Sequence, residues 1–86
     1  MSFKLSIVAP SGKIFEGTVD SFAAPGTEGA FEVYSRHTPL IAALKAGCVR
    51  VRQAGRVTAY DITEGILEVD LQHNVILLAD QATPVQ

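Results

Sequence analysis

Apolar and polar residues alternate along most of this chain, and short turn signals separate the alternating segments. Residues 3–9 place Phe, Leu, Ile and Ala at every second position, and residues 49–52 and 67–71 repeat the pattern. A period of two is typical of half-buried β-strands. Turn residues intervene, as in Pro10–Gly12 and Ala54–Gly55. No segment has the apolar spacing of a long helix, so the sequence predicts an all-β domain, a small flattened sandwich or barrel of about 8–10 short strands.

Two segments depart from this alternation. Residues 75–79 are apolar throughout and predict a strand that is covered on both faces. Residues 39–46 are also rich in apolar side chains, but Gly47 follows them directly, so we expect a short turn or an edge piece there. We expect one sandwich domain over residues 1–80 and a flexible C-terminal tail over residues 81–86.

Charge and composition exclude several classes of function. Seven basic and nine acidic residues give a net charge of −2, whereas a nucleic-acid binder would show a clustered basic excess. No apolar run exceeds five residues, far fewer than the roughly 20 needed to cross a bilayer, and no signal peptide is visible. Cys48 is the single cysteine, and the two histidines give no zinc-ligand spacing with it. We therefore expect no metal, no cofactor, no nucleic acid and no small-molecule substrate.

Candidate catalytic patterns in the chain are incomplete. Ser35 and His37 are close in sequence, but a hydrolytic pair needs facing side chains and a third orienting group, and no Gly-x-Ser-x-Gly elbow is present. The turn at residues 26–29 has two glycines but lacks the Lys-Ser or Lys-Thr of a phosphate loop. Charged residues fall on two strand faces that we interpret as solvated: Glu64, Glu68 and Asp70 on one, Arg50 and Arg52 on the other. The pattern favours a binding module over an enzyme.

Three segments resemble the epsilon subunit of F-type ATP synthases. The family's signature region is similar to PGTEGAFEVYSRHTPLIAALKAG, residues 25–47. Its first two strands are similar to FKLSIVAPSGKIFEG, residues 3–17, and its closing hairpin to ITEGILEVDLQHNVILLAD, residues 62–80. Glu32 departs from the family pattern, which usually has a glycine there. The resemblance runs in register over nearly the whole chain.

The resemblance implies a non-catalytic rotor subunit of the central stalk. Such a subunit binds the gamma subunit, sits on the ring of membrane c subunits, and locks the two together so that ion-driven rotation drives ATP synthesis. It implies a peripheral location on the cytoplasmic face of the bacterial inner membrane. The helical hairpin that follows the sandwich in most bacterial and chloroplast members has no counterpart before Gln86. The sequence leaves open a naturally short member or a truncated one, and proton or sodium coupling.

The resemblance also implies two sets of interface residues. For the gamma subunit, the expected contacts are Ala9, His37, Thr38 and Ala42. For the c ring, they are Thr27, Glu28, Gly29, Ala30 and Glu32. The family often has an acidic residue at position 30, so the two glutamates that flank this position are expected to meet a basic loop of the ring.

A lipoyl- or biotinyl-type carrier domain is the alternative, because these domains are also small β-sandwiches. A carrier needs a modified lysine at a hairpin tip, flanked by Asp, Ala or Met. Lys13 lies near a turn, but its neighbours are Gly12 and Ile14, and Lys4 and Lys45 match no better. An adduct of lipoate or biotin would show directly in the intact mass.

Overall fold

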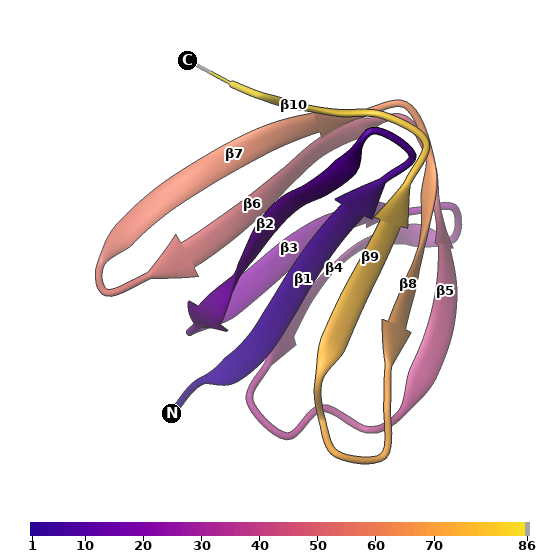
Figure 1. The fold of residues 1–86 in the computed structure, drawn as a ribbon. Coiled ribbons are helices and arrows are strands. Elements are labelled where there is room, and N and C mark those ends of the chain that lie inside the picture. Colours follow the sequence, from indigo (N-terminus) through magenta and orange to yellow (C-terminus); the bar gives the residue numbers. More distant parts are fainter. Residues whose placement is uncertain (86) are drawn as a thin grey trace.

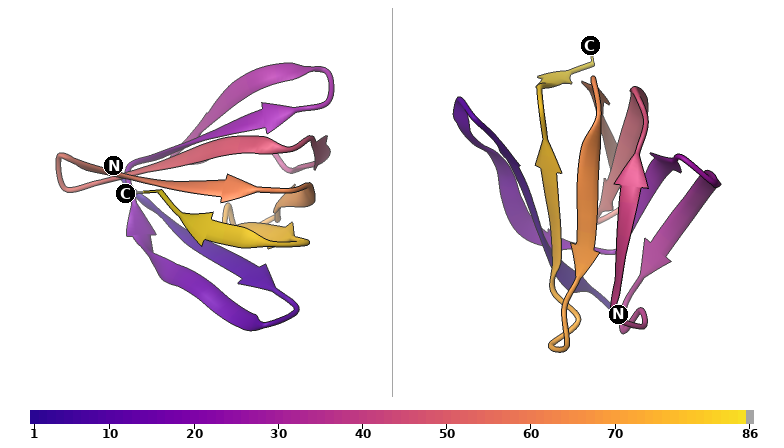
Figure 2. Two further views of the ribbon diagram at one scale, coloured as in Figure 1. Left: turned by 90° about the horizontal axis from the view of Figure 1, so that it is seen from above. Right: turned by 90° about the vertical axis from the view of Figure 1, so that its right-hand side faces the viewer.

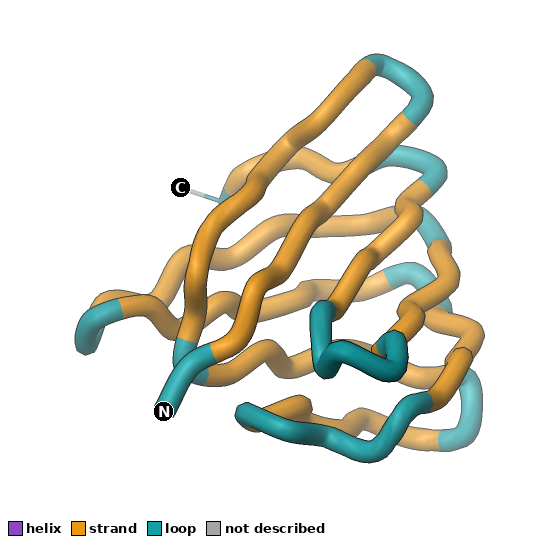
Figure 3. The backbone as a smooth tube through the Cα atoms, turned by 60° about the horizontal axis from the view of Figure 1, so that its bottom comes forward, coloured by secondary structure: helices purple, strands orange, loops and turns teal. Residues whose placement is uncertain are grey.

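The chain folds into strands joined by short turns. A computed structural model describes residues 1–85, and these residues contain no helix, hence none long and apolar enough to cross a membrane (Figures 1 and 3). The predicted all-β class and number of strands are confirmed. The ten strands are β1 (Phe3–Ala9), β2 (Gly12–Val19), β3 (Ser21–Gly26), β4 (Gly29–Tyr34), β5 (Leu40–Leu44), β6 (Gly47–Gln53), β7 (Arg56–Ile62), β8 (Gly65–Val69), β9 (Val75–Ala79) and β10 (Ala82–Pro84).

The strands form two layers (Figure 1). We call the layer in the order β2-β1-β9-β8-β5 the front sheet, and the layer in the order β4-β3-β6-β7-β10 the back sheet. All pairs are antiparallel except β1 with β9. In the right-hand view of Figure 2, β9, β8 and β5 run side by side between the β1–β2 and β3–β4 hairpins. A pairing of Gly26 with Leu44 links β3 to β5, so the two sheets join along one side into an open barrel.

At one corner of the molecule the chain crosses three times from one sheet to the other. β5 continues into β6 through Lys45–Ala46, β7 into β8 through Thr63–Glu64, and β9 into β10 through Asp80–Gln81. Backbone hydrogen bonds continue across the bends, from Thr63 N–H to the Gln81 carbonyl (3.3 Å) and from Asp80 N–H to the Glu64 carbonyl (2.9 Å). The two layers therefore form one hydrogen-bonded unit rather than two separate sheets.

The core lies between the sheets and consists of the inward residues of the alternating segments. Burying each large apolar side chain contributes about 1.5–3 kcal/mol, so this layer supplies most of the stabilising free energy. No buried side-chain polar atom among the described residues lacks a hydrogen-bond partner. The most fully buried large side chains are Leu5, Ile7, Val19, Phe22, Val33, Val49, Val51, Leu67, Val69, Val75 and Leu77.

The structure corrects one expectation about a single segment and decides between two alternatives for another. The prediction that residues 75–79 are covered on both faces is wrong, because Leu78 is 54% exposed and Ile76 is half-buried on the outer side of the front sheet. The segment 39–46 contains β5, which pairs with β8 at every one of its residues. The expected edge piece is therefore confirmed and the turn is not: β5 is a strand with β8 along one side and only the Leu44–Gly26 pairing with β3 on the other.

The C-terminal segment also takes part in the sheet. β10 pairs with β7, with Ala82 opposite Ile62 and Pro84 opposite Tyr60. The strand pairing therefore runs beyond residue 80, where the sandwich was expected to end. Gln86 lies outside the described residues, and flexibility of the tail stays a prediction.

Candidate docking face

Apolar side chains cover the outer side of four neighbouring strands of the front sheet. The strand register aligns them in two rows. The first row runs Ala43, Ile66, Leu78 and Val8 across β5, β8, β9 and β1, and the second runs Ile41, Glu68, Ile76 and Ser6. We call the six apolar members of these rows the apolar face: Val8, Ile41, Ala43, Ile66, Ile76 and Leu78.

The apolar face is open in the chain as it stands. Ile41 is 75% exposed and Ile66 is 51% exposed. The outer side of an antiparallel sheet that meets water is ordinarily polar, and contiguous exposed apolar surface marks interaction sites. Glu68 is the one charged residue in the two rows. The arrangement therefore suits a protein partner that supplies an apolar surface of its own.

A hollow of about 670 Å³ lies at the corner end of the apolar face. Its walls include Ala9, Ile66 and Leu78, together with the acidic residues Glu64 and Asp80. Gly65 also lines it, and a Cβ at that position would lie 2.7 Å from the Leu78 carbonyl oxygen. The close approach of β8 and β9 at this point thus requires glycine.

A second hollow of about 340 Å³ lies at the other end of the apolar face. Its lining includes Pro39 of the loop before β5, Ile41 of β5, Glu68 of β8 and Leu71 of the turn after β8. Leu71 is 78% exposed. A partner can therefore be anchored at both ends of the face.

The predicted gamma-contact residues lie in three places. Ala9 is buried and lines the corner hollow, whereas His37 and Thr38 lie in the loop that leads to the second hollow. The structure thus puts these three residues at opposite ends of the apolar face. Ala42 instead lines a separate hollow of about 310 Å³, beside Phe31 of β4.

Two histidines hold the loop before β5 in place. His73 Nδ1 lies 3.1 Å from the His37 carbonyl oxygen, and His37 Nδ1 lies 2.8 Å from the Thr38 carbonyl oxygen. Because a carbonyl only accepts, both Nδ1 atoms carry the donated proton. The first bond ties this loop to the turn between β8 and β9, so it fixes one end of the apolar face.

Most of the predicted c-ring residues lie together at one hairpin tip. Thr27 and Glu28 form the turn between β3 and β4, Gly29 and Ala30 begin β4, and all four are exposed. The Thr27 N–H donates to the Ala43 carbonyl at 3.0 Å, which attaches the tip to β5. Gly29 has φ +133°, a conformation that other residues rarely adopt.

Glu32 is the exception, since it lies farther along β4 on the outer side of the back sheet. Ala23 of β3 pairs with Glu32 on one side and with Arg50 of β6 on the other. Its carboxylate accepts a hydrogen bond of 2.8 Å from the Tyr34 hydroxyl. That hydrogen bond and the nearby negative charge raise the pKa of Tyr34. The structure therefore does not place Glu32 beside Glu28 at the tip.

The other charged residues have ordinary structural roles. Arg50 and Arg52 share an exposed face, as the sequence predicted. The acidic set borders the apolar face, because Glu64 lines the corner hollow and Glu68 and Asp70 line the second hollow. The Asp70 carboxylate accepts N–H groups of Gln72 and Asn74, each at 2.9 Å, and so stabilises the turn that follows β8.

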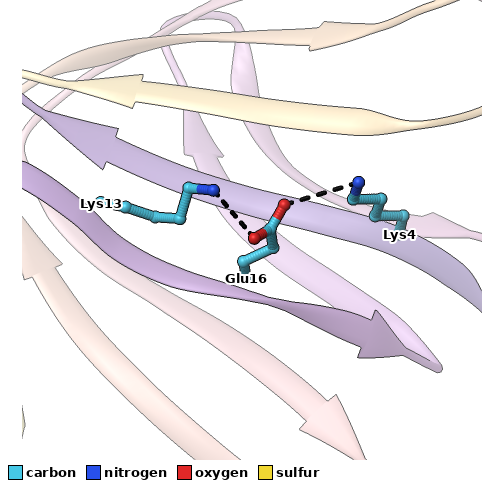
Figure 4. Close-up of polar contacts among 3 residues, drawn as sticks. All are labelled: Lys4, Lys13 and Glu16. Atoms are coloured by element: carbon cyan, nitrogen blue, oxygen red, sulfur yellow. Dashed lines mark hydrogen bonds and ion pairs between the residues drawn. The ribbon is translucent and has the colours of Figure 1, made fainter.

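A small ion-pair network lies at the margin of the front sheet (Figure 4). The Lys13 ammonium lies 2.8 Å from one Glu16 carboxylate oxygen, and the Lys4 ammonium lies 3.5 Å from the other. The hydrogen bond and the charge of Lys13 lower the pKa of Glu16. Lys13 is exposed near the start of β2, where it pairs with Val8 in the strand register, and its ammonium group is held by the Glu16 carboxylate. Residues 1–85 hold no cluster of His, Cys, Asp and Glu that could bind a metal.

Sequence reasoning missed the apolar face itself. Val8 was the one outward residue of its segment that broke the polar alternation, and residues 75–79 were apolar at every position. Val8 is the outward apolar residue of β1, and Ile76 and Leu78 are those of β9. They could have indicated an exposed apolar surface, but only with the strand order known.

A β-sandwich with a contiguous exposed apolar face is typical of an interaction domain. The chain belongs to the family described as ATP synthase, Delta/Epsilon chain, beta-sandwich domain, whose model matches residues 2–85. The family predicted from the sequence is therefore confirmed. The prediction of an accessory chain rather than an enzyme agrees with the name of the relatives described next.

Relatives named ATP synthase epsilon chain match most of this chain. The protein of Chlorobium limicola is 39% identical over 80 residues, which cover 92% of this chain and 91% of that protein. The protein of Desulforamulus reducens is 35% identical over 79 residues, but these cover only 59% of its length. The chain thus spans nearly all of some relatives and little more than half of others.

Solved structures show the same fold at low sequence identity. A chain in the mitochondrial ATP synthase of Euglena gracilis, described as OSCP/F1/c-ring in rotational state 1, superposes with a TM-score of 0.91 at 21% identity and covers 96% of this chain and 53% of that one. A chain in the central stalk/c-ring of the Tetrahymena thermophila mitochondrial ATP synthase has a TM-score of 0.82 at 11% identity, covering 95% and 66%. At these identities the likeness establishes the sandwich fold.

Proposed function

We propose that this chain is the non-catalytic rotor subunit of an F-type ATP synthase, which clamps the gamma subunit to the c ring. In this role it couples ion-driven rotation of the ring to ATP synthesis and performs no chemistry itself. It is peripheral to the membrane, on the cytoplasmic side. The observation that carries the proposal is the apolar face with Ala9 at one end and His37 and Thr38 at the other.

The gamma subunit is the proposed occupant of the apolar face. Ile41, Ile66 and Leu78 leave more than half of their surface in water in the free chain. Covering apolar surface stabilises a complex by roughly 25 cal/mol for each Å² removed from water. This gain explains why a sheet that needs no outer cover for folding keeps apolar side chains on its outer side.

The c ring is the proposed contact of the β3–β4 hairpin tip. Thr27, Glu28, Gly29 and Ala30 project there, and Glu28 offers a carboxylate to a basic loop of the ring. The tip is rigidly attached to β5, because Thr27 N–H donates to Ala43 and Lys45 N–H donates to the Pro25 carbonyl at 2.9 Å. β5 also borders the apolar face, so a short path of hydrogen bonds links the two proposed contacts and transmits torque.

Charge substitutions test the two contacts separately in a reconstituted complex. The variant Glu28→Lys places a positive charge at the hairpin tip against the basic loop, so it should retain gamma and lose ion pumping. The variant His37→Asp removes the imidazole from the gamma contact and should weaken gamma binding by about 1–3 kcal/mol. Gamma retention is measured by co-purification, and pumping by quenching of a pH-sensitive dye. Normal retention and normal pumping in both variants would show that these faces are assigned wrongly.

A further inference from the structure

Three strands of the described chain have a single hydrogen-bonded neighbour: β2, β4 and β10. Each therefore has one open backbone edge, which is a template for pairing with another chain unless something hinders it. β2 is hindered, because its ladder with β1 shifts register between Ile7 and Val8 and the Gln53 side chain donates to the Thr18 carbonyl at 2.9 Å. β10 is hindered because it has only three residues and ends at Pro84.

β4 has none of these hindrances. It has six residues, none of them proline, and pairs with β3 at six successive positions without a register shift. In the described chain no side chain from outside β4 forms a hydrogen bond with it. The one side-chain hydrogen bond of β4, from Tyr34 to Glu32, lies within the strand. β4 is thus the longest regular edge that the back sheet presents to solvent.

The hairpin geometry identifies the backbone groups on the open edge of β4. The turn has two residues and closes at the pair Gly26–Gly29, so hydrogen-bonded and non-hydrogen-bonded pairs alternate from there. The next pair is Pro25–Ala30, and Pro25 has no N–H while its carbonyl bonds to Lys45 on the far side of β3. This pair is therefore of the non-hydrogen-bonded kind. The N–H and C=O groups of Ala30, and by the same alternation of Glu32 and Tyr34, point away from β3.

Charge on this edge selects among possible occupants. Glu32 lies in the middle of the three outward positions, with its side chain exposed. Two copies of β4 paired edge to edge would bring these carboxylates close together, and like charges directly opposite each other are destabilising. A strand that carries Lys or Arg opposite Glu32 would instead form a favourable cross-strand pair.

We propose that the open edge of β4 binds an extended, basic segment of a partner protein by strand addition. The segment pairs its backbone with Ala30, Glu32 and Tyr34 and places a Lys or Arg side chain beside the Glu32 carboxylate. Main-chain bonds supply the affinity and the charge pair supplies the selectivity. This binding is distinct from the proposed gamma contact, because β4 lies in the back sheet and the apolar face in the front sheet. It adjoins the proposed c-ring contact at Ala30, but the peptide test below measures strand addition whether or not that contact exists.

The test uses the full chain and a synthetic probe, an eight-residue peptide of alternating Val and Lys with blocked ends. Amide hydrogen exchange is measured by NMR with and without the peptide at about millimolar concentration. We expect exchange at Ala30, Glu32 and Tyr34 to slow by about tenfold or more, while amides of β10 keep their rates. A peptide of alternating Val and Glu should give no protection.

Two variants at one position separate backbone pairing from charge. Glu32→Pro removes an outward N–H that the β3 ladder does not use, whereas Glu32→Gln keeps that N–H and removes the charge. We expect Glu32→Pro to abolish protection at Ala30 and Tyr34, and Glu32→Gln to keep it with affinity for the Lys peptide lowered several-fold. Exchange in the unmodified chain decides the question even if the proline variant fails to fold. Absence of protection by the Lys peptide, or equal protection by the Glu peptide, would overturn the proposal.

Discussion

The outer faces of the two sheets have the same strand geometry but differ in their side chains, which are apolar in the middle of one and charged in the middle of the other. Ile66 and Leu78 occupy the middle of the front sheet, whereas Arg50 and Arg52 occupy the middle of the back sheet. Both sheets bury the same kind of apolar residue on their inner sides. Folding requires only the inner faces to be apolar, and a polar outer face such as that of the back sheet costs nothing in water. The apolar outer face of the front sheet therefore needs an explanation beyond folding, and binding of a partner supplies one.

The largest expected effect is a difference in stability between substitutions on the inner and the outer side of one strand. Leu77 is fully buried, and its neighbour Leu78 faces outward on β9. Leu77→Ala should lower the free energy of unfolding by about 2–5 kcal/mol because it leaves a cavity. Leu78→Ala should change it by only about 0.5 kcal/mol, as at other surface positions. Urea unfolding of both variants checks the difference, and a comparable loss in the two would mean that the apolar face serves folding.

A smaller effect is expected where β8 and β9 approach most closely. In Gly65→Ala the new methyl group would meet the Leu78 carbonyl oxygen at 2.7 Å and a Leu77 methyl carbon at 3.1 Å. The strands must shift, so we expect a loss of about 1–3 kcal/mol in the free energy of unfolding. Thermal unfolding followed by circular dichroism measures it. Stability equal to that of the unmodified chain would show that this end of the apolar face is not rigid.

Removing the charges of the back sheet should have little effect. Arg50 and Arg52 are exposed, and neither forms an ion pair within residues 1–85. The double variant Arg50→Ala with Arg52→Ala should therefore change the free energy of unfolding by no more than about 1 kcal/mol and leave gamma binding intact. Co-purification with gamma checks the second point. Loss of gamma in this variant would assign the contact to the back sheet.

The smallest effect concerns pH at the margin of the front sheet. The pKa of Glu16 is lowered in the folded chain from its usual 4.5, because the Lys13 ammonium bonds to its carboxylate. The resulting stabilisation is present above pH 4.5 and is lost as the pH falls through the lowered value. NMR titration should show this pKa return toward 4.5 in Lys13→Met. An unchanged pKa in that variant would mean that Lys13 is not its cause.

Local features of the fold could be predicted well from the sequence. The alternation in residues 3–9 gave β1 with its inward set, and Ala54–Gly55 forms the predicted turn between β6 and β7, with φ of +50° and +80°. β5 was not recognised as a full strand, because five apolar residues in a row carry no period. Its strand conformation comes from pairing with β8, which lies more than twenty residues away in the chain.

The candidate site could be predicted only in part. The resemblance indicated Ala9, His37 and Thr38, and the structure places them at the ends of one face. The face itself was not visible, because Val8 and Leu78 come from opposite ends of the chain and only the parallel pairing of β1 with β9 brings them together. Periodicity shows which residues point to the same side of a strand, but not whether anything covers that side.

The central claim, that the front sheet rather than the back sheet binds gamma, can be tested with one matched pair of variants. Leu78 on the apolar face is 54% exposed, and Val57 on the outer side of the back sheet is 58% exposed. Leu78→Lys and Val57→Lys thus introduce the same charge at positions of similar exposure. The dissociation constant for purified gamma subunit should rise by about 10- to 100-fold in Leu78→Lys and stay within about twofold in Val57→Lys. Equal effects of the two substitutions, or a larger effect of Val57→Lys, would contradict the claim.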